Sequence, residues 1–177
     1  MPAYTPNKPS IEWYTPKDII ERARLVLGSI DLDPASCDYA QETVKAKTYH
    51  TKETDGLSKS WRGRVWLNPP YGRGIRHWIN KVVHEYENGA VESAIIIVNN
   101  ATDVSWFQSF WKYSICFVTG RVYFERPGSQ ADSPAQGSAI IYMGKENSRF
   151  SEHFSDLGPV FEFAGDGLRK FKSKGIQ

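Results

Sequence analysis

The sequence predicts an α/β fold, in which a compact mixed sheet carries helices on both faces. A chain of 177 residues is long enough for one domain with a sizeable core. Segments rich in Ile and Val alternate with segments of helical period, which is typical of parallel strands joined by helices. Later in the chain the apolar segments follow one another closely, and this spacing favours an antiparallel edge.

The first predicted helix covers residues 15–28. Thr15 is expected to be its N-cap, and Pro16 fits the first helical position because proline has no N–H to satisfy there. Apolar residues recur along this segment at helical spacing, which indicates one buried face. Gly28 is expected to end the helix, since glycine adopts the left-handed conformation that terminates helices.

The remaining elements are predicted from the same two patterns, which are apolar segments for strands and apolar residues at helical spacing for helices. A run of consecutive apolar residues at 93–99 predicts a strand that is covered on both faces. Further strands are expected at residues 29–33, 64–68, 114–119, 121–124, 138–143 and 160–163, and further helices at residues 38–47, 74–88 and 104–111.

The ends of the chain differ in composition from its middle. Three prolines in residues 1–12 predict an extended arm. Residues 13–164 are expected to form a single domain, in which residues 125–137 are a loop rich in Gly and Pro. The basic residues 165–177 are expected to form a flexible tail.

Composition excludes several classes of protein. The net charge is only +2, from 22 basic and 20 acidic side chains, and does not by itself indicate nucleic-acid binding. The longest apolar run, residues 94–98, is too short to cross a bilayer, and the first residues do not resemble a secretory signal. Two distant cysteines and four scattered histidines have no metal-ligand spacing. We therefore expect a cytoplasmic protein that has no membrane partner and uses no metal.

Two unusual tetrapeptides follow predicted strands, namely Asp33–Ser36 and Asn68–Tyr71. In sheets of this kind, ligands bind in a crevice beyond the carboxyl ends of the parallel strands. Both tetrapeptides are therefore predicted to face one crevice, which is where function is expected.

The motif Asn68-Pro69-Pro70-Tyr71 is suited to hold an amino group on a flat ring. Two prolines make the turn rigid and remove two N–H donors. The Asn68 amide oxygen and the Pro69 carbonyl can accept the two hydrogens of an exocyclic amine while the Tyr71 ring stacks on the heterocycle. The nitrogen lone pair then becomes nucleophilic without a cysteine nucleophile.

The sequence resembles phage-type DNA N6-adenine methyltransferases over residues 12–163. The matching segments, in order, are Trp13–Pro16, Asp31–Ser36, Thr54–Leu57 with Trp61, Asn68–Tyr71 with Trp78, and Gly120–Phe124. The resemblance implies a Rossmann-like methyltransferase fold, S-adenosyl-L-methionine as the methyl donor and adenine in DNA as the acceptor. It also implies direct, site-specific transfer to the N6 amine without a covalent enzyme intermediate.

The resemblance implies two groups of site residues. Asn68, Pro69, Pro70 and Tyr71 are the catalytic group. The donor is expected to lie against Thr15, Pro16, Asp33, Pro34, Ala35, Ser36 and Asp55. Asp33 can accept hydrogen bonds from ribose hydroxyls or meet the ammonium of the donor, and the helix start after Thr15 can receive its carboxylate. The glycines that follow this motif in larger methyltransferases are missing here, and Glu42 is a candidate for a second ribose contact.

DNA contacts are expected from three arginines, Arg73, Arg76 and Arg121, with Lys81, Arg126 and Arg149 as further candidates. An adenine in duplex DNA must leave the base stack to reach Tyr71. The motif leaves two alternatives open. The chain is an amino-methyltransferase acting on RNA adenine or protein glutamine, or it is a non-catalytic relative that binds nucleic acid. The resemblance also implies a phage or prophage protein at work in a bacterial cytoplasm.

Overall fold

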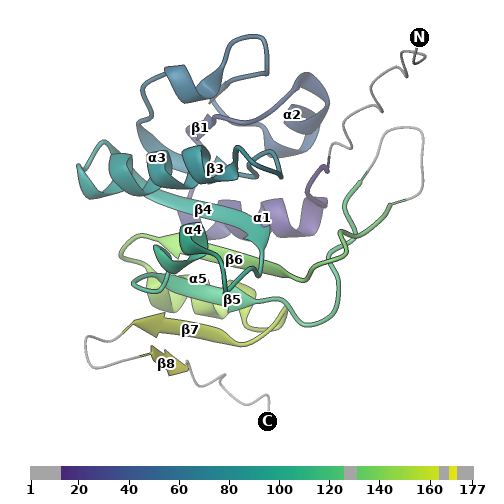
Figure 1. The fold of residues 1–177 in the computed structure, drawn as a ribbon, viewed down its shortest axis with the longest axis vertical. Helices are drawn as coiled ribbons and strands as arrows, with labels where there is room; N and C mark the ends of the chain where they lie inside the picture. The colour runs from purple at the N-terminus through teal and green to yellow at the C-terminus, as the bar shows by residue number, and fades with distance from the viewer. Residues whose placement is uncertain (1–12, 126–130, 164–167, 171–177) are drawn as a thin grey trace, which may run out of the picture.

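The structure is a computed structural model and describes residues 13–125, 131–163 and 168–170. Within these ranges one eight-stranded sheet has the strand order β2-β1-β3-β4-β6-β5-β7-β8 (Figure 1). Its strands are β1 (Leu32–Asp33), β2 (Thr48–Tyr49), β3 (Gly63–Leu67), β4 (Val91–Asn99), β5 (Ser114–Phe117), β6 (Ser138–Met143), β7 (Val160–Phe163) and β8 (Leu168–Lys170).

The sheet has a parallel half and an antiparallel half, which confirms the predicted mixed architecture. Strands β2, β1, β3 and β4 are parallel to one another. Strands β6, β5, β7 and β8 add antiparallel pairings. The carboxyl ends of β1, β3 and β4 therefore meet at one edge of the sheet, where a crevice is expected.

Helices cover both faces of the sheet (Figure 1). They are α1 (Lys17–Leu27), α2 (Asp38–Val44), the 3₁₀ turn η1 (Gly56–Ser58), α3 (Ile75–Glu87), α4 (Ser105–Gln108) and α5 (Asn147–Phe154). One apolar cluster lies under α1 and α5, and a second lies under α3 and α4. Strand β4 supplies Ile95 and Ile97 to the first cluster and Ile96 and Val98 to the second, as its consecutive apolar residues predict.

Helix α1 begins two residues later than predicted. Pro16 is the N-cap in extended conformation, and the Thr15 hydroxyl makes no capping hydrogen bond, so the prediction of Thr15 as N-cap was wrong. Gly28 ends the helix as predicted, with φ +81° and an N–H that donates to the carbonyl of Arg24.

Other differences lie where local patterns are weak. The predicted strand at residues 121–124 is wrong, because this segment forms only isolated bridges, from Phe124 to Asp132 and from the next residue, Glu125, to Tyr14. Strand β1 is shorter than predicted, helix α2 ends at Val44, and helix α4 ends before residue 109. Strand β2 and helix α5 were not predicted.

The predicted arm and most of the predicted tail lie outside the described residues. Three residues of that tail form β8, which pairs with β7. Within the described part of the chain, the helices lack the length and apolar character that crossing a bilayer requires.

Candidate active site

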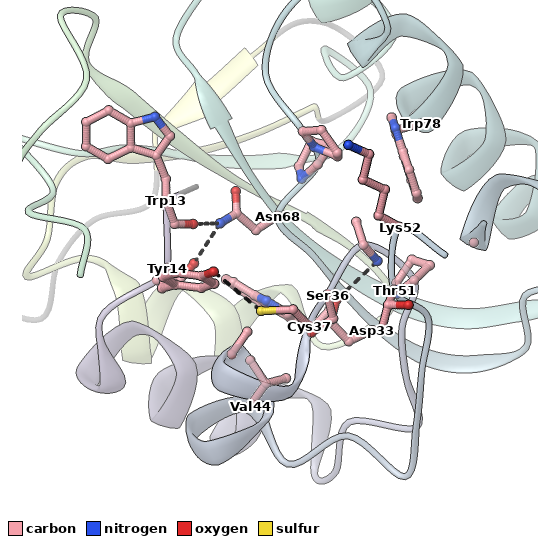
Figure 2. Close-up of a pocket in the computed structure, with 18 of the residues that line it drawn as sticks. Trp13, Tyr14, Asp33, Ser36, Cys37, Val44, Thr51, Lys52, Asn68 and Trp78 are labelled. Carbon is pink, nitrogen blue, oxygen red and sulfur yellow. Dashed lines mark hydrogen bonds between the residues drawn. The ribbon is translucent and has the colours of Figure 1, made fainter. Parts of the chain in front are cut away.

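A cavity of about 430 Å³ lies beyond the carboxyl ends of β1 and β3 (Figure 2). Both tetrapeptides singled out in the sequence line it, Asp33–Ser36 after β1 and Asn68–Tyr71 after β3. The segment that precedes α1 and the segment around η1 complete the wall. The topology thus brings together residues that lie far apart in the chain.

Asn68 is held from the start of the described chain. Its side-chain nitrogen donates to the Trp13 carbonyl oxygen at 2.8 Å and to the Thr15 hydroxyl oxygen at 3.3 Å (Figure 2). Both amide hydrogens are therefore used, because an amide nitrogen carries only two. The amide oxygen of Asn68 is buried and has no hydrogen-bond partner among the described residues, and Asn68 is one of the residues that line the cavity. It is the group of Asn68 that is left to accept a hydrogen bond from a ligand.

The rest of this motif forms the adjoining wall. Pro69 is buried and Pro70 is exposed, and both line the cavity. The Tyr71 ring packs partly against the apolar cluster under α3 and α4. Its hydroxyl is buried without a partner among the described residues, and burial raises the pKa of Tyr71 above its usual value of about 10. Tyr71 is therefore neutral and presents an aromatic ring rather than a charge.

Asp33 is a buried carboxyl at the opposite side of the same crevice, and only 2% of its surface is exposed. Burial raises the pKa of Asp33 to about 7, although hydrogen bonds from Ser36, the Ala35 N–H and Gln41 act in the other direction. The Gln41 amide donates to Asp33 at 2.8 Å. Near neutral pH, Asp33 can thus become negatively charged when a positive group enters the pocket.

A neighbouring carboxyl, that of Asp31, connects the start of β1 to other parts of the chain. Arg64 from β3 donates to Asp31 through its side chain at 2.8 Å and its N–H at 2.9 Å, and Lys47 lies 2.7 Å away. Partial burial alone would raise the pKa of Asp31, but these hydrogen bonds outweigh it and hold the pKa well below its usual range. Asp31 does not line the cavity and ties β1 to β3.

The far wall depends on close packing around Gly56. A Cβ atom at Gly56 would lie 1.9 Å from the Pro34 carbonyl oxygen, so only glycine permits this approach. The Trp61 indole donates to the Gly56 carbonyl at 2.8 Å, and its ring lies 6.0 Å from that of Trp78. Trp78 in turn lines the cavity beside Lys52 (Figure 2).

Several sequence-predicted donor-site residues reach the cavity and others do not. Asp55 lines it, with φ +50° and a carboxylate that accepts from the Leu57 N–H at 3.2 Å. Thr15, Pro34, Ala35 and Ser36 also line it. The structure does not bring Pro16 or Glu42 to the cavity wall, and Glu42 is exposed on α2. Pro16 instead accepts the first hydrogen bonds of α1.

The cationic candidates lie outside the cavity. Arg73 and Arg76 are exposed at the start of α3, close in sequence to Tyr71. Arg121 is exposed and donates to the Pro134 carbonyl at 3.4 Å. Of the further candidates, Lys81 pairs with Glu85 and lies over the Trp61 ring, and Arg149 is exposed on α5, which packs under the other face of the sheet. Arg126 lies outside the described residues.

Several cavity residues were not identified as site residues from the sequence. Trp13, Tyr14 and Trp78 stood within segments of the resemblance, but no role followed from that position. Cys37 directly follows Ser36 and is the N-cap of α2, whereas Thr51 and Lys52 reach the cavity because β2, which precedes them, lies beside β1. Among the described residues, no group of three His, Cys, Asp or Glu side chains is placed to hold a metal ion.

Comparison with known proteins gives two matches. The family model for DNA N-6-adenine-methyltransferase (Dam) matches residues 3–154. The DNA N-6-adenine-methyltransferase of Escherichia phage T1 is 29% identical over 105 residues, which are 58% of this chain and 42% of that protein. The matched part of the chain thus spans less than half the length of this curated relative.

Proposed function

Because this chain belongs to the DNA N-6-adenine-methyltransferase (Dam) family, we propose that it methylates the N6 amine of adenine in DNA, with S-adenosyl-L-methionine as donor. The observation that carries this proposal is the unpartnered, buried amide oxygen of Asn68, a residue that lines the cavity. A buried acceptor without a partner is costly, so its presence at a cavity points to a ligand that donates to it.

The cavity fits the donor in size and in chemistry. A volume of about 430 Å³ is in the range of pockets that hold cofactors. Asp33, Ser36 and Asp55 would hold the donor, since they offer acceptors and a hydroxyl to its ribose, ammonium and adenine groups. When bound, S-adenosyl-L-methionine supplies an electrophilic methyl group on a positively charged sulfur. The buried Asp33 carboxyl suits a cationic ligand, because a nearby positive charge favours its ionised form.

Asn68 and Pro69 act on the target amine in this proposal. The Asn68 amide oxygen and the Pro69 carbonyl each accept one hydrogen of the amine, which frees its lone pair from conjugation with the ring. As the nitrogen gains positive charge, both acceptors stabilise it, and they need no rearrangement because the turn is already rigid. The new N–C bond would form at the amine itself as the bond between the methyl carbon and the donor sulfur breaks, which would leave a neutral thioether. The cationic amine would then lose one proton to solvent, so no covalent enzyme intermediate is needed.

Tyr71 orients the flat base in this mechanism. Its neutral ring is held by the cluster under α3 and α4, so its position is set before the base arrives. Stacking on such a ring is independent of base-edge hydrogen bonds. An adenine in duplex DNA would have to leave the stack to reach this site.

DNA would approach from the edge of the sheet that carries the cavity. Arg73 and Arg76 stand exposed a few residues after Tyr71, and Arg121 is exposed beside the segment that pairs with Tyr14. We propose that these three side chains contact phosphates and thereby orient the strand without reading its sequence. Because the matched relative comes from a phage of Escherichia, we propose that this chain acts in the cytoplasm of a bacterial host.

The test is a methyl-transfer assay with labelled S-adenosyl-L-methionine and three separate acceptors, DNA, RNA and protein. The proposal expects label in DNA alone, and N6-methyladenine in the digested nucleosides. Label in RNA or in protein glutamine would redirect the same chemistry to another acceptor. Absence of transfer together with absence of S-adenosylhomocysteine binding would contradict the enzymatic function and favour a nucleic-acid binder.

A further inference from the structure

A side chain from α2 fixes the loop that follows β1. The Gln41 nitrogen donates to Asp33 at 2.8 Å and to the Ser36 hydroxyl oxygen at 2.7 Å, and the Gln41 oxygen accepts from the Ala46 N–H at 2.9 Å. Both amide hydrogens are used, because the amide nitrogen carries two. Gln41 itself does not line the cavity, whereas Asp33 and Ser36 do.

The contact of Gln41 with Asp33 and Ser36 lies in the loop where larger methyltransferases have glycines that this sequence lacks. Here the loop is held by hydrogen bonds instead, from Gln41 and from the Ser36 N–H to the His50 carbonyl oxygen at 2.8 Å. Side-chain hydrogen bonds of this kind define the position of a loop without a special backbone conformation. Gln41 thus acts on two cavity residues at once.

Resting on the proposed function, we propose that Gln41 is a positioning residue of the donor site, which holds Asp33 and Ser36 at the cavity wall and keeps Asp33 ready to meet the donor as a carboxylate. A hydrogen bond donated to a carboxylate favours its ionised form, whereas burial opposes it. In Asp33, burial is the larger effect, and the bond from Gln41 is one of the three that counteract it. Loss of this bond should therefore raise the pH at which the carboxylate becomes available.

The surroundings of Asp33 hold other charges, which any pH experiment must take into account. On the elements packed around it, the titratable and charged groups are Asp31 with Lys47 and Arg64, Asp38 and Glu42 on α2, His50 after β2, Cys37 and Tyr14 at the cavity, and Lys52 and Asp55 on the far wall. The groups that hydrogen-bond Asp33 are Gln41, Ser36 and Ala35. Gln41, on α2, is therefore the partner outside the β1 loop that a single substitution can remove.

The experiment measures the binding of S-adenosylhomocysteine by calorimetry across pH, with no turnover required. For the unmodified protein we expect the affinity to rise with pH and to level off above about 7. Gln41→Glu keeps the length of the side chain and the acceptor for Ala46, but it replaces the donor by an oxygen. We expect binding at neutral pH to weaken about tenfold or more. We also expect the pH midpoint to move upward, because one of the hydrogen bonds that favour the ionised form of Asp33 is lost.

Two further variants separate positioning from general structure. Gln41→Met keeps the size of the side chain and adds no charge. It should move the pH midpoint of binding in the same direction as Gln41→Glu. If Gln41→Glu does not fold, Gln41→Met provides the test. Glu152→Gln makes the reverse exchange on an exposed residue of α5, which does not line the cavity, and should leave the midpoint unchanged. Thermal unfolding of each ligand-free variant checks that α2 is intact.

The possible results separate this proposal from the proposed function. If Gln41 only held α2 in place, its variants would weaken binding by the same factor at every pH. An unchanged midpoint in both Gln41 variants would therefore overturn the proposal while leaving the methyltransferase function standing. If the unmodified protein bound no S-adenosylhomocysteine at any pH, the proposed function would fail, and the role of Gln41 with it.

Discussion

The side-chain nitrogen of Asn68 lies 2.8 Å from the carbonyl oxygen of Trp13, a residue 55 positions earlier in the chain. This bond and the longer one to the Thr15 hydroxyl use both N–H donors of the Asn68 amide. The amide oxygen is then the group of Asn68 that is left to accept a hydrogen bond. The segment before α1 therefore sets the orientation of the group on which the proposed chemistry depends.

Asn68→Ala should abolish methyl transfer while leaving donor binding nearly unchanged. The substitution removes the acceptor for the target amine, and loss of one such preorganised group costs about 10²–10³-fold in turnover. Labelled methyl transfer to DNA and calorimetry with S-adenosylhomocysteine measure the two effects separately. Asn80→Ala, on the exposed face of α3, is the matched control and should behave as the unmodified protein. Near-normal turnover of Asn68→Ala would remove Asn68 from the catalytic group.

Thr15→Val should lower turnover more than donor affinity. The substitution keeps the shape of the side chain but removes the hydroxyl that accepts from Asn68, so the amide loses one of its two anchors. We expect turnover at saturating donor to fall by about tenfold, as for loss of one buried hydrogen bond. Thr15→Ser retains the hydroxyl and should recover most of the activity. If Thr15→Val instead weakened S-adenosylhomocysteine binding at unchanged turnover, Thr15 would belong to the donor site.

Tyr71→Phe should be tolerated, whereas Tyr71→Ala should not. The Tyr71 hydroxyl is buried without a partner among the described residues, so its removal costs no hydrogen bond seen there. We expect Tyr71→Phe to keep turnover within about threefold and to unfold at the same temperature or higher. Tyr71→Ala removes the stacking ring, and turnover should fall by about tenfold or more. Equal losses in the two variants would show that the hydroxyl is used.

Asp33 should make the ligand-free protein less stable as the pH rises from about 4 to about 7. The unfolded chain ionises Asp33 near its ordinary pKa of 3.8, but the folded protein holds the proton up to about 7. The folded state therefore binds more protons in this window, and the stability lost by pH 8 is at most about 4 kcal/mol. Urea unfolding at several pH values, compared with Asp33→Asn, measures this effect. Parallel pH curves for the two proteins would contradict it.

Asp31 provides a control of opposite sign for that experiment. Its pKa is lowered in the folded protein by Arg64 and Lys47, so its contribution to stability is present above the ordinary pKa and is lost as the pH falls below it. Asp31→Asn should therefore destabilise the protein by a constant amount between about pH 5 and 8. Its curve should approach that of the unmodified protein only in acid.

Arg73→Ala and Arg76→Ala should weaken DNA binding without changing S-adenosylhomocysteine binding. Both side chains are exposed near Tyr71, and neither lines the cavity. If each contacts one phosphate of a duplex, the slope of log affinity against log salt should fall by about 0.9 per substitution. Arg149→Ala removes the same charge from α5 on the other face of the sheet and should have no effect. Unchanged salt slopes for Arg73 and Arg76 would place the DNA elsewhere.

Much of the fold could be predicted because burial leaves a periodic mark in the sequence. The apolar run in β4 indicated a strand covered on both faces, and α3 and β6 were found nearly to their ends. Strand β2 and helix α5 were missed for the opposite reason. The two residues of β2 are exposed, and α5 buries only Phe150, Ser151 and Phe154. Both elements are short, with two residues in β2 and eight in α5, so each offers little sequence over which a period can be recognised.

For the site, the chemical groups and the sheet edge at which they meet could be predicted from the amino-acid sequence alone. The motifs Asp33–Ser36 and Asn68–Tyr71 each follow a strand, and parallel strands must place such turns at a common edge. Which atoms of those groups are left without a partner depends on the three-dimensional packing of the chain. The anchors of Asn68 before α1, and the contact of Gln41 with Asp33, join residues whose spacing follows no local rule. A hydrogen bond between such partners depends on the packing of whole elements, and this packing leaves no mark in the local sequence.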